Sequence, residues 1–229
     1  ADMVSMARPF LADADFVNKA AEGRAQTIAP CIACNQACLD HTFSGKLTSC
    51  LVNPRACHET ELTITPADTA KRIAVVGAGP AGLSAAITAA ERGHKVTLFD
   101  RAAELGGQLN MARVIPGKEE FHGLVEAGPN DLAGFDEVII ATGVIPRDPG
   151  IDGQDGPNVL SYIDVLRGKA KVGKRVAVVG AGGIGFDVSE FLVHEGESPT
   201  ENLSLWREEW GVGDPAEVRG GLAPQGPQP

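Results

Sequence analysis

The chain has 229 residues, of which 43% are hydrophobic and 22% charged, and its mean hydropathy is close to zero. This composition is typical of a soluble globular protein and excludes a disordered chain. The formal charge of −10 disfavours nucleic acid and anionic membranes as partners, because both favour basic patches. No apolar run is long enough to span a bilayer and no secretory leader is recognisable, so we expect a cytoplasmic protein without a membrane partner.

Residues 1–30 are expected to be the end of a domain. A short apolar segment at 3–6 predicts a strand, and residues 13–22, which follow Arg8 and Pro9, predict a helix. One strand and one helix do not make a complete domain, so the rest of that domain is expected upstream.

The next segment contains all five cysteines of the chain. This density favours a metal or cluster site in a reducing compartment over a disulfide framework. The spacing C-x2-C-x3-C-x11-C predicts a 4Fe-4S cluster held by Cys31, Cys34, Cys38 and Cys50. Zinc is the alternative, although structural zinc sites usually contain two C-x2-C pairs. Cys57 is expected to be a small buried hydrophobic side chain, and the segment is expected to need its metal to become ordered.

Residues 71–110 predict a βαβ unit. Gly77-x-Gly79-x-x-Gly82 separates a buried strand from an Ala-rich helix, and the second strand ends at Asp100. The glycines allow a tight turn and let a pyrophosphate approach the helix amino terminus, while Asp100 can accept hydrogen bonds from ribose hydroxyls. Because strand, helix and acid stand where a dinucleotide needs them, the segment predicts a dinucleotide site.

The pattern continues with a helix predicted at 118–126 and a buried strand predicted at 135–143. VAVVGAGGIG then repeats IAVVGAGPAG, so Gly180-x-Gly182-x-x-Gly185 predicts a second strand, glycine turn and helix. This second turn is expected to bind the pyrophosphate of another dinucleotide. No further strand with an acidic or basic end follows it, so the sequence does not reveal which nucleotide is preferred.

These motifs together resemble one family of proteins. CIACNQACLDHTFSGKLTSC, RIAVVGAGPAGLSAA, LFDRAAELGGQL, FDEVIIATGVIPR and VAVVGAGGIGFDVSEFL are similar, in this order, to iron-sulfur flavoproteins related to old yellow enzyme and trimethylamine dehydrogenase. The bacterial NADPH-dependent 2,4-dienoyl-CoA reductases are the members that they resemble in particular. The resemblance implies an α/β fold: Rossmann-like parallel sheets that bind FAD and NAD(P), preceded by the cysteine-rich iron-sulfur segment and the tail of a TIM barrel.

The resemblance also implies a function in fatty acid β-oxidation. NADPH would pass hydride to FAD, and single electrons would cross the 4Fe-4S cluster to FMN, which reduces an enoyl thioester. The four cysteines named above would be the cluster ligands, and Ala7 and Arg8 would lie at the FMN phosphate, where a guanidinium suits bidentate contact. The residues expected to bind FAD or NADPH are Gly77, Gly79, Ala81, Gly82, Asp100, Gln108, Lys118, Thr142, Gly143, Gly180, Gly182 and Gly185.

The departures from the family are equally informative. Its barrel, with the proton-donating groups and most of the FMN site, is not in this sequence, so the enoyl-CoA would bind a barrel domain outside this chain. No catalytic residue is assigned here. Residues 122–130 replace a longer helix and a strand on the adenine side of FAD, so the chain resembles a shortened fragment or an internally deleted relative.

The expected division is a barrel tail at 1–30, a cluster segment at 31–70, a shortened FAD domain at 71–150 and a partial NAD(P)H domain at 151–229. Two alternatives stay open. One is a non-catalytic domain with a structural metal and weak nucleotide binding. The other is a reductase module like the glutamate synthase small subunit, which shares the tandem glycine motifs but arranges its cysteines differently.

Overall fold

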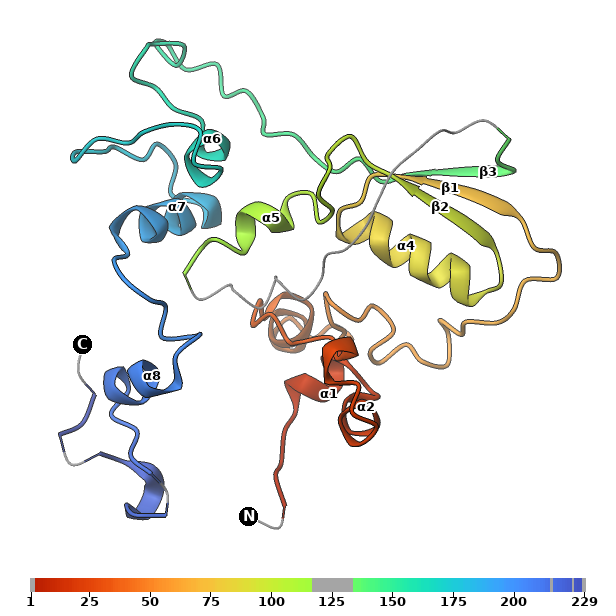
Figure 1. Ribbon diagram of the computed structural model, residues 1–229, viewed down its shortest axis with the longest axis horizontal. Coiled ribbons are helices and arrows are strands. Elements are labelled where there is room, and N and C mark those ends of the chain that lie inside the picture. Colours follow the sequence, from red (N-terminus) through yellow and green to blue (C-terminus); the bar gives the residue numbers. More distant parts are fainter. Residues whose placement is uncertain (1–2, 117–133, 215, 224, 228–229) are drawn as a thin grey trace. The chain divides into compact units, whose positions relative to one another are not determined.

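The computed structural model describes residues 3–116, 134–214, 216–223 and 225–227. These residues form two compact units (Figure 1). The first unit contains residues up to 110 together with 134–146, and the second contains 111–116 and the residues from 147 onwards. The helix predicted at 118–126, and with it Lys118, lies outside the described residues.

A parallel sheet of three strands forms the core of the first unit. The strand order is β2-β1-β3, with β1 at Arg72–Val76, β2 at Lys95–Phe99 and β3 at Glu137–Ile140. The central strand β1 is apolar on both faces, as is typical of buried parallel strands, and its register places Val75 between Leu98 and Ile139. The predicted βαβ unit is therefore confirmed. The strand predicted at 135–143 is present as β3, but it is shorter than expected and mostly exposed instead of buried.

Helix α4 (Pro80–Glu91) connects β1 to β2 and covers one face of this sheet (Figure 1). It begins with Gly79 as N-cap and Pro80 in its first turn, where the missing N–H of proline costs no helical hydrogen bond. It ends before Gly93, whose φ of 90° suits glycine. The core between helix and sheet consists of Ile73, Val75, Ala86, Ala89, Val96, Leu98 and Ile139.

The opposite face of the sheet is covered only in part. Ala74 is fully buried there, and the ring of Phe99 meets the ring of Phe135 edge to face at 5.7 Å. On the edge strand β3, however, Val138 is 49% exposed and Ile140 is 76% exposed. Among the described residues, no helix or strand covers these two side chains.

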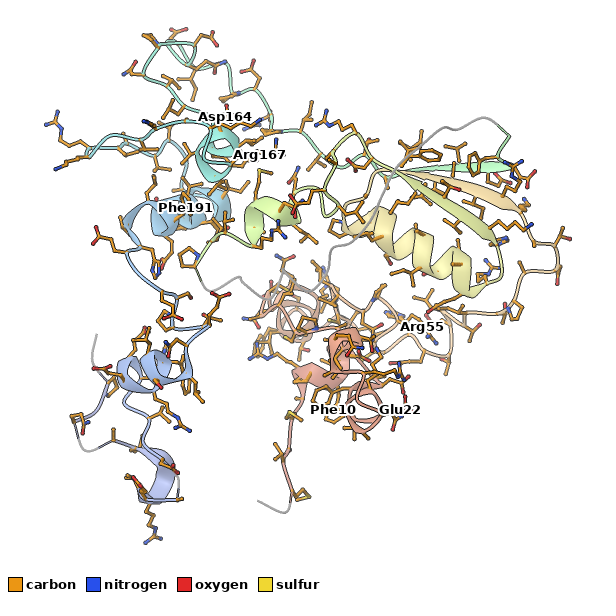
Figure 2. All side chains as sticks on the ribbon, viewed as in Figure 1. Phe10, Glu22, Arg55, Asp164, Arg167 and Phe191 are labelled. Atoms are coloured by element: carbon orange, nitrogen blue, oxygen red, sulfur yellow. The ribbon has the colours of Figure 1, made fainter. Side chains whose placement is uncertain are left out.

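Short helices and loops make up the rest of the first unit. They are α1 (Arg8–Ala12), α2 (Phe16–Ala21), η1 (Ala25–Thr27), the π-helix η2 (Gln36–Asp40) and α3 (His41–Phe43). The strand predicted at 3–6 is wrong: within the described residues the segment has no pairing partner, and Met3 is 86% exposed. The helix predicted at 13–22 is shorter than expected, and α1, with Phe10 (Figure 2), precedes it.

A buried carboxylate, Asp13, holds these helices to the segment that leads into the cysteines. It accepts hydrogen bonds from Lys19 Nζ at 2.6 Å, the Ala29 N–H at 2.9 Å and the Asp15 N–H at 3.0 Å. Burial alone would raise the pKa of Asp13, but the bond from Lys19 and the backbone N–H groups together lower it below its ordinary value. This carboxylate therefore fixes the position of the chain two residues before Cys31.

The second unit contains helices and loops in its described part. Its elements are α6 (Tyr162–Leu166), α7 (Gly183–Val193), α8 (Leu203–Glu209) and η4 (Arg219–Gly221), and α5 (Leu109–Ala112) lies at the boundary with the first unit in the sequence. Helix α6 packs against α7. Figure 2 labels Asp164 and the C-cap Arg167 of α6, and Phe191 of α7. Each of these two helices buries one valine, Val165 and Val188.

The second predicted strand is not formed. Residues 174–179 have no strand pairing, and Val179 is 81% exposed. A strand needs a neighbour to satisfy its backbone groups, and the described residues after α7 form α8 instead of a pairing strand. Helix α7 itself is confirmed at the expected place. None of the helices in the described ranges combines the length and the apolar character needed to cross a membrane.

Candidate functional site

The first glycine turn contains two positions that only glycine can occupy. Gly77 has a φ of 110°, and a Cβ there would lie 2.1 Å from the carbonyl oxygen of Ala141. A Cβ on Gly82 would lie 1.7 Å from the carbonyl oxygen of Gly77. Gly79 is different, because no heavy atom lies within 4 Å of its Cβ position. The structure thus needs Gly77 and Gly82 for packing and leaves open space at Gly79, where a ligand can approach the backbone.

The amino terminus of α4 opens at this turn. Gly79 is the N-cap and no side chain caps it by a hydrogen bond. The N–H groups of the first turn, that of Ala81 among them, have no partner within the helix. Together with the helix dipole they form a site that favours an anionic group such as a pyrophosphate.

Asp100, at the end of β2, is bound to this turn. One carboxylate oxygen accepts the Ala78 N–H at 2.7 Å and the other accepts the Ala102 N–H at 2.8 Å. Burial would raise the pKa of Asp100, but these backbone bonds and the charge of Arg101 lower it, so the group is ionised at neutral pH. A carboxylate can accept about four hydrogen bonds, so capacity remains for ribose hydroxyls.

The loop after β2 completes the same edge of the sheet. The Gly106 N–H donates to the Ala78 carbonyl at 2.8 Å, and a Cβ on Gly107 would lie 3.2 Å from Gly79 Cα. Gln108 Nε2 donates to the Val144 carbonyl at 2.6 Å and so joins this loop to the segment after β3.

Thr142 and Gly143 lie in that segment, between β3 and Val144, and Gly143 has a φ of 78°. Residues expected to bind FAD from three separate motifs therefore meet at the carboxyl edge of one parallel sheet, where open α/β sheets bind their ligands.

The second glycine turn reproduces the geometry of the first. Gly180 has a φ of 126°, Gly182 is the N-cap of α7, and a Cβ on Gly185 would lie 2.0 Å from the Gly180 carbonyl oxygen. The surroundings of the two turns differ. In the first turn the Cβ position of Gly77 lies against Ala141, whereas no described heavy atom lies within 4 Å of the Cβ position of Gly180 in the second. The described residues therefore contain the turn and the helix expected of a second dinucleotide site, but not the expected sheet.

The four cysteines predicted as cluster ligands line a single pocket. The pocket is partly open to solvent. The residues around it are Arg8, Leu11, Cys31, Ile32, Cys34, Asn35, Ala37, Cys38, Cys50, Leu51 and Val52. Cys57 does not line the pocket and is exposed, so the expectation of a buried side chain is wrong: its φ of 64° marks a turn at the surface.

The backbone around this pocket has unusual conformations. Ala33 and Asn35, on either side of Cys34, have φ values of 51° and 57°. Such left-handed residues are strained by of order 1–3 kcal/mol each and cluster at ligand sites. Cys38 lies in the π-helix η2, another feature found frequently at functional sites.

Zinc and a four-iron cluster, the two groups that the spacing left open, place different demands on the cysteines. A zinc ion bound by thiolates needs sulfur atoms about 3.8 Å apart, from its tetrahedral geometry and bond length. Within the described ranges, no three Cys, His, Asp or Glu side chains lie close enough to hold one metal ion. A four-iron cluster puts an iron atom at each cysteine, so its thiolates are farther apart. The four cysteines around the pocket supply the number of thiol ligands that such a cluster requires.

Arg8 lines the cysteine pocket, and its Nη1 donates to Asn35 Oδ1 at 2.9 Å. Ala7 is the N-cap of α1. Contact of these two residues with an FMN phosphate stays a prediction. The sequence did not indicate Asn35 as a site residue; asparagine's tolerance of the left-handed conformation was the signal that could have marked it.

Comparison with known proteins agrees with the dinucleotide-binding features. A family described as "NAD(P)-binding Rossmann-like domain" matches residues 75–138, and one described as "Pyridine nucleotide-disulphide oxidoreductase" matches residues 107–200. The NAD(P)-binding Rossmann-like fold with its parallel three-stranded sheet is thereby confirmed.

Relatives of the chain are longer proteins. A metal reductase of Desulforamulus reducens is 39% identical over 89% of this chain and 34% of its own length. A bilirubin reductase of Mediterraneibacter gnavus is 34% identical over 85% of the chain and 34% of its own length. An NADH oxidase of Thermoanaerobacter brockii is 37% identical over 87% of the chain and 35% of its own length. The chain spans about a third of the length of these relatives.

Among solved structures, a 2-naphthoyl-CoA reductase in complex with 2-naphthoyl-CoA is similar to the chain. It has a TM-score of 0.78 and 32% identity, and the match covers 83% of this chain and 32% of that one. The matched domains and these relatives support NAD(P) and flavin binding and an electron-transfer role. The homologues of this chain are flavin-dependent oxidoreductases of the old yellow enzyme and trimethylamine dehydrogenase-like family.

Proposed function

We propose that the chain is the electron-transfer portion of an iron-sulfur flavoprotein oxidoreductase resembling NADPH-dependent 2,4-dienoyl-CoA reductase. Electrons would pass from NADPH through FAD and a 4Fe-4S cluster to FMN in a barrel domain, where an enoyl thioester is reduced. The observation that carries the proposal is the arrangement of the first unit, in which four cysteines line one pocket and three motifs meet at a dinucleotide-binding sheet edge.

The residues of this chain would bind and orient these groups. The N–H groups at the amino terminus of α4 would hold the FAD pyrophosphate above Gly79, and Asp100 would accept from the ribose. Gln108 would keep the segment after β3 close to the same edge through its bond to Val144. In the second unit, the turn from Gly180 to Gly185 would hold the pyrophosphate of NADPH.

The cysteine pocket would hold the cluster through Cys31, Cys34, Cys38 and Cys50. The lining is largely apolar and includes Leu11, and the apolar surroundings of a cluster are one of the factors that set its potential. The residues of the pocket belong to the same unit as those of the proposed FAD site.

The substrate class is proposed from the resemblance and from one solved relative. The 2-naphthoyl-CoA reductase binds a CoA thioester in its complex, and an enoyl-CoA for the parent of this chain belongs to the same chemical class. The reduction would take place in the barrel domain, to which residues 1–30 would form the tail. Residues 31–70, 71–150 and 151–229 would then be the cluster segment, the FAD domain and part of the NADPH domain.

The first experiment is an ultraviolet-visible spectrum of the anaerobically purified chain, with iron, acid-labile sulfide, zinc and released flavin assayed on the same sample. We expect about four irons and four sulfides for each chain, together with bound FAD. A colourless protein containing zinc would refute the cluster and support the non-catalytic alternative. Iron without FAD would refute the flavin part of the proposal alone.

The second experiment uses NADPH as the reductant and an artificial dye as the acceptor. We expect dye reduction that depends on bound FAD. If the chain holds both FAD and iron but reduces no dye with either NADPH or NADH, the assignment of the second glycine turn is refuted, because the electron donor would have no binding site.

A further inference from the structure

The cysteine pocket has a lining of unusual charge. Apart from the four cysteines, its side chains are apolar or amide, with the single exception of Arg8. The guanidinium group of arginine carries a positive charge. One permanent positive charge therefore lies at the rim of a pocket whose predicted occupant is anionic.

The position of Arg8 is held by a specific contact. Its Nη1 donates to Asn35 Oδ1 at 2.9 Å, and Asn35 is the residue after Cys34, in a left-handed backbone conformation. Arg8 is the first residue of α1, and the Leu11 carbonyl of the same helix accepts from Asn53 Nδ2 at 3.0 Å. Two hydrogen bonds thus join α1 to the loops on both sides of the pocket, and one of them fixes the guanidinium to the residue after Cys34.

We infer that Arg8 raises the reduction potential of the cluster held by these cysteines, by stabilising its reduced form. This inference rests on the proposed function. Reduction adds one electron, taken from the reductant, to the cluster and its four thiolates, so the group gains one negative charge. A fixed positive charge at the pocket stabilises the more negative state more than the less negative one.

The exposure of Arg8 limits the effect. Its side chain is exposed, so solvent and ions weaken its field. The contribution must therefore decrease as salt is added, since the Debye length falls from about 10 Å at 0.1 M to about 3 Å at 1 M. A role limited to packing would not show this dependence on salt.

The test compares the midpoint potential of the cluster in the full chain and in three variants, by anaerobic titration with dithionite followed by visible absorbance. Arg8→Gln removes the charge and Arg8→Lys keeps it without the guanidinium fork. Arg24→Gln is the matched control, because Arg24 is an exposed arginine bound to Glu22 and does not line the pocket. Iron and sulfide are measured in every sample.

We expect the midpoint to shift to more negative values in Arg8→Gln, less so in Arg8→Lys, and not in Arg24→Gln. The shift in Arg8→Gln should decrease at high salt. An Arg8→Gln variant with full iron and sulfide and the midpoint of the parent would overturn the inference while leaving the proposed function intact. A parent chain without iron would instead refute the proposed function, and the inference with it.

Arg8→Gln could also fail to assemble its cluster. A second neutral variant, Arg8→Met, then decides the question, because methionine keeps an unbranched apolar stem without the charge. An Arg8→Met variant with full iron and sulfide and the midpoint of the parent would then overturn the inference.

Discussion

Replacement of two glycines of the first turn by alanine should separate folding from nucleotide binding. A Cβ on Gly82 would lie 1.7 Å from the Gly77 carbonyl oxygen, far inside the 3.0 Å below which real Cβ contacts essentially do not occur. Both atoms belong to the backbone, so the turn must open. Such overpacking costs typically about 1–3 kcal/mol, and the better helix propensity of alanine offsets about 1 kcal/mol of it. A contact this close belongs at the upper end of that range, so we expect Gly82→Ala to lose about 2 kcal/mol of stability.

Gly79→Ala should have the opposite effect: it should weaken FAD binding and leave the stability of the fold nearly unchanged. Gly79 has a φ of −77°, which alanine adopts without strain, and no heavy atom lies within 4 Å of its Cβ position. The loss of a glycine N-cap should cost no more than about 1 kcal/mol. The new methyl group would occupy the space in which the FAD pyrophosphate approaches the backbone. We expect the dissociation constant of FAD to rise at least about tenfold, which corresponds to about 1.4 kcal/mol.

The assay has to report on the first unit. Both tryptophans, Trp206 and Trp210, belong to the second unit, so fluorescence would not follow the sheet. Urea unfolding monitored by far-ultraviolet circular dichroism, together with FAD titration of the flavin-free chain, measures both quantities. An unchanged FAD affinity in Gly79→Ala would refute pyrophosphate binding at this turn. Unfolding of Gly82→Ala at the same urea concentration as the parent would refute the close contact with Gly77.

Three further predictions concern other groups. Cys34→Ser should abolish cluster assembly, and full iron and sulfide in this variant would contradict the ligand assignment. Asp100→Ala should weaken FAD binding with the iron content unchanged, because the bond to the Ala78 N–H and the ribose acceptor are both lost; equal loss of FAD and iron would point to misfolding instead. Since the folded state lowers the pKa of Asp13 below its ordinary value of 3.8, its stabilising contribution is present above that pH and is lost as the pH falls through the lower folded value. Asp13→Asn should therefore unfold with a weaker dependence on acidic pH than the parent, as measured by urea unfolding.

The parts of the fold that were predicted correctly depend on neighbouring residues. The apolar run of β1, the glycine turn, the Ala-rich helix α4 and the apolar run of β2 each carry their signal within a few positions. The cysteine spacing likewise identified four side chains that the structure brings to one pocket. Proximity in the sequence and identity of side chains are sufficient for such predictions.

The predictions that failed needed information from elsewhere in the chain. The segments at 3–6 and 174–179 have the composition of strands, but neither pairs with another strand among the described residues. A strand is stabilised by its neighbour's backbone groups, which the segment itself cannot supply. Cys57 was expected to be buried because cysteines usually are, whereas its position in a surface turn leaves it exposed.

The sequence by itself determined the βαβ unit, the repeated glycine turns and the four cysteines as one group. Each of these features depends on residues close together in the chain: the apolar periodicity of strands and helix, the backbone freedom of glycine and the ligand chemistry of cysteine. Only the tertiary structure decided that Asp100 binds the glycine turn, that Gln108 binds the chain after β3 and that Arg8 lies at the cysteine pocket. Each of these contacts joins residues far apart in the chain. These contacts form only after folding has brought the segments together, and the spacing of residues in the sequence does not show which segments will meet.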